Sequence, residues 1–281
     1  MKVLYYFFSK LPLGILYMIS DFLSFFLKRF YRRKVVQKNL LNSFPNKSEE
    51  ERKKIYNGFY KNFCDVFIEV LKGYTITKKE LKKRIFIENF DEMNQIISKR
   101  KPIVIICSHQ CNWEWLLLSI GTYFDVHSFG FFGIYKKLSN KTFDEIIYDM
   151  RTKFGGTMIE AQKAVNYMNQ NLDSINIIGL AADQCPRIDN KVFWQNLLNQ
   201  ETAFYRGIEL IPKKINCEVF FLTMRRVKRG YYSMKLLSLN SPPYDMNKLE
   251  ILPKYANSLE KEINENPSNW LWSHKRWKII K

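Results

Sequence analysis

The chain has few of the residues that build disulfide frameworks and metal sites. Its 281 residues include five cysteines, an odd number at irregular spacing, and three histidines. This usage fits a reduced, cytosol-facing protein better than a disulfide-stabilised secreted domain. Cys107, His109 and Cys111 form a C-x-H-x-C stretch, but this is not the usual ligand spacing of zinc and no second ligand pair follows. We therefore expect no metal site.

Several other sequence signatures are missing. No stretch matches a zinc finger, the aromatic signature of an RNA-binding sheet or a basic zipper, which argues against a dedicated nucleic-acid binder. No serine stands in a nucleophile elbow, so a catalytic base would activate a group of the substrate. We find no repeats, no low-complexity tract and no interior linker. The soluble part of the chain is therefore expected to form one domain.

Acidic residues are scarce relative to basic ones. There are 27 Asp and Glu against 45 Lys and Arg, which gives a net charge of +18. An excess of this size indicates an anionic partner, which could be nucleic acid, an anionic lipid surface or an acidic protein. With 46% apolar and 16% aromatic residues the chain is globular, and many aromatics lie near the N-terminus or near basic clusters, as at a membrane interface. A membrane partner is favoured.

The N-terminal segment is nearly all apolar over residues 3–27. As a helix it would extend about 37 Å, and a bilayer core is about 30 Å thick. No small-residue cleavage site follows, so a signal peptide is not expected. The run ends in a basic cluster, which would lie on the cytoplasmic side of a membrane. Its members are Lys28, Arg29, Arg32, Arg33, Lys34 and Lys38.

Interruptions leave the arrangement of this segment open. Lys10 and Asp21 lie within it, and Pro12 weakens its middle. A spanning helix, a helix in the membrane interface and a buried core helix all remain possible readings. We expect residues 1–30 to form a membrane-associated helix and residues 31–281 to form the functional domain.

Beyond this segment, patterns typical of strands and helices alternate. Ser48 and Glu51 have the spacing of a capping box ahead of a helix over 49–72. The continuously apolar run at 103–106 is typical of a strand covered on both faces. Strands are expected at about 84–88, 102–107, 126–132, 157–160, 175–181, 218–226 and 231–237, and further helices at about 90–99, 112–123, 141–154, 161–171, 201–215 and 247–264. The sequence predicts a layered α/β domain with a mixed, largely parallel sheet flanked by helices, preceded by an N-terminal hydrophobic membrane helix.

A histidine follows the expected strand 102–107. In such a sheet, ligands bind beyond the carboxyl ends of the strands, where His109 lies. Asn112 is a candidate N-cap of the next helix and would place Glu114 in its first turn. A carboxylate bonded to one imidazole nitrogen fixes the tautomer and leaves the other nitrogen free as a base. The alternative is a hydrogen-bonded structural histidine.

The H-x-x-N-W-E stretch at 109–114 resembles the active-site motif of the late acyltransferases of bacterial lipid A biosynthesis. These are lauroyl and myristoyl transferases within the lysophospholipid acyltransferase superfamily. Further resemblances follow in order along almost the whole chain. They are N-L-L-N-S-F-P at 39–45, Arg151 with Gly155, A-D-Q-C-P-R at 182–187, F-W at 193–194, E-T at 201–202 and W-L-W-S-H-K-R-W at 270–277.

The resemblance implies transfer of a fatty acyl group from an acyl-carrier-protein thioester to a hydroxyl of a lipid A precursor, without a cofactor. His109 would remove the hydroxyl proton, Glu114 would orient His109, and Arg151 would stabilise charge on the thioester oxygen. From the residues alone, Arg151 is interpreted as an exposed helix residue and Asp183 as a turn residue ahead of Pro186. The substrate-binding residues implied are Asn112, Trp113, Asp183 and Gln184.

The same resemblance implies three anionic partners that would attract the basic surface of the chain. These are the acyl carrier protein, the lipid acceptor and the inner leaflet, at the cytoplasmic face of the cell inner membrane; nucleic acid is not among them. Candidate contact regions are the basic clusters at 28–38, 225–229 and 275–278, each of which is also readable as a solvated charge run. Other acceptors (an amino-lipid, a lysophospholipid or a polyene pigment) and a catalytically silent membrane-binding protein remain alternatives.

Two departures from the family pattern concern the shape of the pocket. Cys111 stands where H-x-G-N-W-E has glycine, and F-W-Q at 193–195 replaces F-F-G. Both leave the histidine and the carboxylate in place and bear on the identity of the acceptor. We expect bulky Trp115, Phe193 and Trp194 to set the depth of the acyl pocket.

Overall fold

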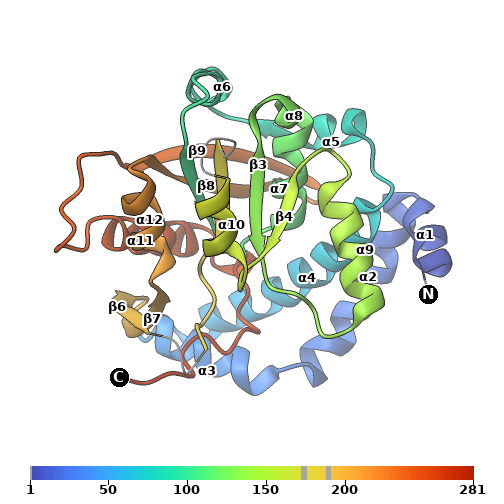
Figure 1. Ribbon diagram of the computed structural model, residues 1–281. Coiled ribbons are helices and arrows are strands. Elements are labelled where there is room, and N and C mark those ends of the chain that lie inside the picture. Colours follow the sequence, from blue (N-terminus) through green and yellow to red (C-terminus); the bar gives the residue numbers. More distant parts are fainter. Residues whose placement is uncertain (1, 172–175, 188–190) are drawn as a thin grey trace.

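A seven-stranded sheet forms the centre of the molecule, with strand order β1-β9-β8-β2-β5-β3-β4 (Figure 1). The computed structural model describes residues 2–171, 176–187 and 191–281. The β8–β9 pair is antiparallel and the other pairs of this sheet are parallel, so the mixed, largely parallel sheet is confirmed. The strands are β1 (Ile85–Ile87), β2 (Ile103–Cys107), β3 (Phe131–Tyr135), β4 (Thr157–Glu160), β5 (Ile177–Ala181), β8 (Glu218–Lys228) and β9 (Tyr231–Asn240).

Helices cover both faces of this sheet (Figure 1). Successive side chains of a strand point to opposite faces. Val104 of β2 accordingly belongs to a core cluster with Leu259, and Ile105 to a second cluster with Leu118. The helices beyond the N-terminal pair are α3 (Arg33–Ser43), α4 (Glu49–Gly73), α5 (Lys78–Arg84), α6 (Phe90–Ser98), α7 (Trp113–Tyr123), α8 (Val126–Phe129), α9 (Lys141–Thr152), α10 (Ala164–Gln170), α11 (Gly207–Ile215) and α12 (Leu252–Glu265).

Most expected elements lie within a few residues of the observed ones, but the strand expected at 126–132 was wrong. Its first half is the short helix α8, and Gly130, with φ of 56°, separates it from β3. Residue 175, the first of the strand expected at 175–181, lies outside the described residues, and β5 begins at Ile177. A short apolar run fits a helical turn as well as a strand, so periodicity alone does not separate them.

The helix expected at 201–215 was wrong in its first half. Strands β6 (Val192–Leu197) and β7 (Gln200–Tyr205) form an antiparallel hairpin, and α11 begins only at Gly207. Leu198 and Asn199 make the turn, with φ of 51° and 62°. Two positive φ values are typical of the type I′ turn, which matches the twist of paired strands.

The N-terminal segment is two helices, not the single helix expected over residues 1–30. Helix α1 (Lys2–Lys10) and helix α2 (Leu13–Phe30) are bent by 111° across a break at Pro12, which lacks an amide hydrogen and restricts the residue before it. Among the described residues no single helix is long and apolar enough to cross a membrane, whereas the bent pair qualifies by length and composition. A spanning helix is therefore not confirmed.

Helix α2 packs along α4 and is partly embedded in the domain. Leu13 and Leu16 are buried in the core cluster on the α7 side of the sheet. Ser20 is also buried and donates a hydrogen bond of 2.6 Å to Asp65. The division of the chain at residue 30 stays a prediction.

Candidate active site

Two adjacent parallel strands end beside each other and carry His109 and Asp183. Cys107 of β2 pairs with Ala181 of β5, and the amide of Ala182 donates to the carbonyl of Cys107. His109 and Asp183 each follow two residues after this matched pair, so the strand register brings them together. The expected location of His109, beyond the carboxyl end of its strand, is confirmed.

Asp183 holds both the backbone and the ring of His109. Its carboxylate lies 2.6 Å from Nδ1 and accepts the His109 amide at 3.0 Å. Since a carboxylate accepts, Nδ1 carries the proton and Nε2 is left with a free lone pair. Burial alone would raise the pKa of Asp183, but the charge and hydrogen bonds of His109 and the Trp270 indole hold it below its usual range. Asp183 is therefore an ionised partner that holds the imidazole in the tautomer whose Nε2 can accept a proton.

The C-terminal segment completes this arrangement. Trp270 Nε1 donates to Asp183 Oδ2 at 2.8 Å, and the amide of Cys111 donates to the carbonyl of Asn269. Trp270 also forms an isolated β-bridge with Gln110. Residues more than 150 positions apart in the sequence therefore enclose the buried side of the His109–Asp183 pair.

Glu114 is paired with Arg151 and not, as expected, with the imidazole. Its carboxylate accepts from Arg151 Nε at 2.8 Å and from Nη2 at 2.6 Å, a bidentate pair. Burial would raise the pKa of Glu114, but the Arg151 guanidinium lowers it; Glu114 in turn raises the pKa of Arg151 against burial. In the first turn of α7 the carboxylate is directed toward α9, where Arg151 lies, and Asp183 takes the place beside His109.

Trp113 lies between the two pairs. Its ring meets the His109 ring edge-on at 5.2 Å between centroids, and its Nε1 donates to Glu114 Oε1 at 3.1 Å. The side chains of His109 and Arg151 are 17% and 18% exposed, whereas Asp183 and Glu114 are almost fully covered. The imidazole and the guanidinium are thus both partly exposed, and each is backed by a buried carboxylate.

Asn112 organises the loop from inside. Its Oδ1 accepts the amide of Trp115, which confirms the expected N-cap, and its Nδ2 donates to Glu69 at 2.8 Å. Fully buried Glu69 also accepts the hydroxyls of Tyr17 and Tyr232, at 2.7 and 2.6 Å. Both polar atoms of Asn112 are therefore engaged within the protein, and we assign it to positioning the loop. Glu69 was missed, although an acidic residue beside the apolar stripe of its helix was a visible signal.

Cys111 adopts the backbone conformation that favours glycine. Its φ is 53°, in the left-handed region that side chains with a Cβ rarely enter. This explains why the family motif that the stretch resembles has glycine here. The cysteine is buried, and its thiol contacts the carbonyl of Met224 at 3.1 Å.

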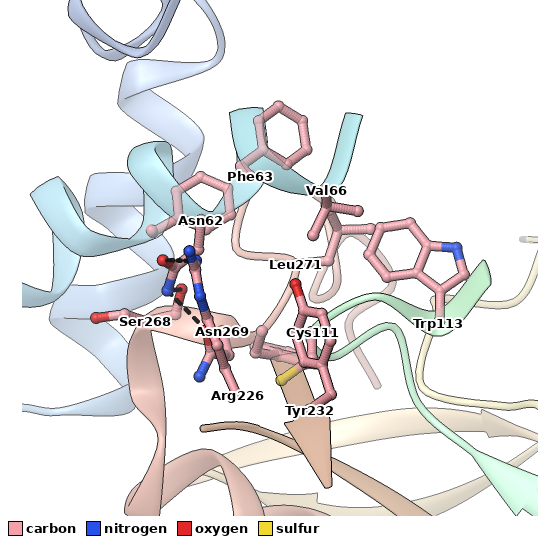
Figure 2. A pocket seen from close by; sticks show the side chains of 12 residues that line it. Asn62, Phe63, Val66, Cys111, Trp113, Arg226, Tyr232, Ser268, Asn269 and Leu271 are labelled. Atoms are coloured by element: carbon pink, nitrogen blue, oxygen red, sulfur yellow. Dashed lines mark hydrogen bonds between the residues drawn. The ribbon is translucent and has the colours of Figure 1, made fainter. Parts of the chain in front are cut away.

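The residues expected to set the depth of the acyl pocket lie in different parts of the described core, Trp115 in one cluster and Phe193 against the other. Trp115 is fully buried and donates to the carbonyl of Glu69, while Phe193 and Trp194 lie on β6. A cavity of about 10 Å³ lies against Trp113 and Cys111 (Figure 2), which is room for about one water molecule. Gln184 is half-buried next to Asp183, and its substrate-binding role stays a prediction.

The basic cluster at 225–229 is largely engaged in ion pairs. Arg226 and Arg229 both bind the buried carboxylate of Asp65, and Arg225 binds Glu262. In the cluster at 275–278, Arg276 is 1% exposed and lies 4.6 Å over the ring of Phe204. The cluster at 28–38 differs, because most of its cations are exposed.

His274 provides a pH-dependent contribution to stability. Its Nε2 accepts the amide of Cys185 at 2.9 Å, and burial lowers its pKa from 6.5 to about 4. The unfolded chain therefore binds this proton at higher pH than the folded protein does. We expect His274 to remove about 3 kcal/mol from the free energy of unfolding as the pH falls from 7 to 4.

Urea unfolding of the wild type and His274→Asn at pH 7 and at pH 4.5 measures this contribution. Other groups with lowered pKa values, Asp183 and Glu114 among them, change stability in the same direction in both proteins. The free energy of unfolding therefore falls between pH 7 and pH 4.5 by different amounts in the two proteins, and this difference isolates the contribution of His274. Equal pH dependence in the two proteins would contradict the assignment.

Comparisons with known proteins find matches over nearly the whole chain. A family model described as "Bacterial lipid A biosynthesis acyltransferase" matches residues 3–279. The lipid A biosynthesis lauroyltransferase of Escherichia coli (strain K12) is 24% identical over 278 residues, which cover 96% of this chain and 87% of that protein. The match therefore includes both strand ends, α9 and the C-terminal segment.

Proposed function

The chain belongs to the bacterial lipid A biosynthesis acyltransferase family, and from this premise we propose that it transfers a fatty acyl group from an acyl-carrier-protein thioester to a hydroxyl of a lipid A precursor. The observation that supports this reaction most strongly is the pairing of His109 with Asp183 next to the pairing of Arg151 with Glu114. Acyl transfer needs a base for the hydroxyl and a cation for the carbonyl oxygen, and these two pairs offer both.

His109 acts as the general base. Nε2 takes the hydroxyl proton while the hydroxyl oxygen attacks the thioester carbon, and Asp183 stabilises the imidazolium that forms. Collapse of the tetrahedral intermediate breaks the carbon–sulfur bond, and the imidazolium returns its proton to the leaving thiolate. The products are an ester and a free carrier-protein thiol, and no covalent bond to the enzyme forms.

Arg151 stabilises the negative charge on the thioester oxygen. Glu114 fixes the guanidinium through two hydrogen bonds and leaves Nη1 without a hydrogen bond to any of the described residues. A donor held in place before the reaction stabilises the transition state without a cost of reorientation. Glu114 thus acts through Arg151, and Asp183 takes the role of orienting His109.

The donor and the acceptor are both anionic in this proposal. The net charge of +18 favours an acidic carrier protein and a phosphorylated lipid. The exposed cations of the 28–38 cluster are the surface proposed to meet lipid headgroups at the cytoplasmic face of the inner membrane.

A second surface supports membrane docking. We call the exposed large apolar residues of α1 and α2 the N-terminal apolar face. Its members are Val3, Leu4, Tyr6, Phe7, Phe8, Ile15, Met18, Ile19, Phe22, Leu23, Phe25, Phe26 and Phe30. Soluble proteins usually expose large apolar side chains singly, whereas here thirteen stand on two consecutive helices. With the basic cluster at its end, it suits a helix pair lying in the interface of an anionic bilayer.

The double variant Met18→Glu/Phe22→Glu tests this docking. The two side chains are 72% and 65% exposed, so folding should be unaffected. Burying such a side chain contributes about 1.5–3 kcal/mol, so binding to vesicles of phosphatidylethanolamine and phosphatidylglycerol should weaken at least about tenfold. Asn94→Glu/Gln95→Glu makes the same charge change on exposed positions of α6, on another side of the molecule (Figure 1), and should bind like the wild type. Equal binding by both variants would contradict the docking surface.

Purified protein tests the reaction itself. Acyl transfer is measured from acyl-carrier protein and from acyl-coenzyme A, with a lipid A precursor, a lysophospholipid or an amino-lipid as acceptor. The proposal predicts product with the lipid A precursor, and faster transfer from the carrier protein. Product only with another acceptor would keep the chemistry and exclude the proposed substrate. Membrane binding without transfer to any acceptor would favour a catalytically silent protein.

A further inference from the structure

An apolar cleft of about 410 Å³ lies between α1, the end of α4 and α9. Its volume is in the range of small-molecule sites, about 300–1,000 Å³. It is lined by Leu4, Tyr5 and Phe8 of α1, Leu71 of α4, and Phe143 and Ile146 of α9, together with two polar residues at the start of α9. Figure 1 shows α1 beside α9, and Lys2 joins them through Glu145 at 3.0 Å.

The cleft shares α9 with Arg151, and its wall at Tyr5 lies close to Glu69 of α4, which binds Asn112 and Trp115 on either side of Glu114. Ile146 lies five residues before Arg151 on α9, a separation of about 7.5 Å along the helix axis. Tyr5 lies at the opposite wall, where its hydroxyl contacts the carbonyl of Val70 at 3.4 Å. Burial and the nearby charge of Glu114 raise the pKa of Tyr5, which agrees with a position beside the Glu114–Arg151 pair.

The cleft is also continuous with the N-terminal apolar face. Leu4 and Phe8 are 61% and 41% exposed and belong both to that face and to the lining of the cleft. An apolar chain in the cleft would therefore be covered by protein on one side and lie next to the docked membrane on the other.

We propose that this cleft binds the hydrocarbon chain of the acyl group that is transferred. The assignment rests on the proposed function, in which Arg151 holds the thioester oxygen. The chain attached to that carbonyl then starts at Arg151, on the helix that forms one wall of the cleft, whereas the acceptor hydroxyl must lie at His109 Nε2. The lining of the cleft, and not Trp115, Phe193 and Trp194, then sets the preferred chain length.

Substitutions that widen or narrow the cleft test this assignment. Phe143→Ala removes a ring from α9, and Leu4→Trp adds one to α1; both positions are partly exposed, so folding should persist. A single methylene in an apolar pocket changes selectivity by about 10–200-fold. We expect the ratio of transfer rates for long and short acyl donors to rise about tenfold in Phe143→Ala and to fall about tenfold in Leu4→Trp.

Phe7 provides the matched control. It lies on α1, is 67% exposed and is not part of the cleft lining, so Phe7→Trp should keep the wild-type ratio. An unchanged ratio in both cleft variants, with transfer intact, would overturn the cleft assignment and leave the proposed reaction in place. A changed preference for the acylation state of the acceptor, at an unchanged donor ratio, would overturn it as well.

A binding measurement separates failure of the cleft from failure of the reaction. An unreactive alkyl thioether of the carrier protein is titrated into the full-length wild type, Leu4→Trp and Phe7→Trp. We expect the longer alkyl chains to bind about tenfold more weakly to Leu4→Trp than to the other two proteins. This result would support the cleft even if no turnover were detected. Absent turnover would count only against the proposed reaction. Equal binding by the three proteins would overturn the cleft assignment.

Discussion

Replacing His109 by alanine is expected to lower the rate constant of acyl transfer by about 10²–10⁴-fold, the usual contribution of a positioned general base. The imidazole lies at the end of β2, and its Nε2 is left free because Asp183 holds Nδ1 at 2.6 Å. Initial rates at saturating donor and acceptor measure this loss. Removing the imidazole also leaves the buried Asp183 carboxylate without one of its hydrogen-bond donors, so the melting temperature should fall and is measured alongside.

Asp183→Asn is expected to cause a loss of similar size. An asparagine amide can present its NH₂ to the ring, which would favour the wrong tautomer and remove the charge that stabilises the imidazolium. Because the two residues act as one unit, the double variant His109→Ala/Asp183→Asn should be about as slow as either single variant. Losses that multiply in the double variant would show that the two residues act separately.

Arg151→Lys carries the second large expected effect, a fall of about 10²–10³-fold in kcat. Lysine keeps a positive charge but loses the two parallel hydrogen bonds to Glu114, so the cation is no longer held at one position. The affinity for the acceptor should change much less than kcat, since Arg151 is proposed to act on the developing charge. A kcat close to that of the wild type would contradict this role.

The partner of Arg151 requires a control for stability. Removing one member of a buried ion pair costs about 3–5 kcal/mol, because the other charge is left unpaired. The double variant Glu114→Gln/Arg151→Gln removes both charges and should therefore melt closer to the wild type than Glu114→Gln does. It should remain as inactive as Arg151→Lys, which separates loss of catalysis from loss of folding.

The location of His109, the proposed base, followed from the sequence. A continuously apolar strand, a histidine two residues beyond it and an N-cap at Asn112 are local features, and each was found where expected. The resemblance to a family added Arg151 and Asp183, which local patterns alone would have assigned to a helix surface and a turn.

The partner of the base did not follow from the sequence. Asp183 is 74 positions from His109, and the two meet only because β2 and β5 are parallel neighbours in a particular register. Spacing favoured Glu114, which is near in sequence but directed toward α9. Register between strands that are distant in sequence is a tertiary property and is not encoded in periodicity.

The burial of charged residues also could not be predicted from the sequence. Glu69 and Arg276 occupy positions that composition alone would assign to a surface, and both are almost fully covered. Whether a charged residue in a basic run faces solvent depends on the elements packed around it. Arg226, for example, forms an ion pair with Asp65 of α4, which is more than 160 positions away in the sequence.

Mass spectrometry of lipid A and of total lipids from cells with the gene, without it, and carrying His109→Ala tests the central claim most directly. The account predicts that lipid A loses one acyl chain both in cells without the gene and in cells with His109→Ala. Lipid A that is unchanged while another lipid loses an acyl chain would contradict the proposed acceptor. An unaltered lipid profile in all three would contradict the acyltransferase activity itself.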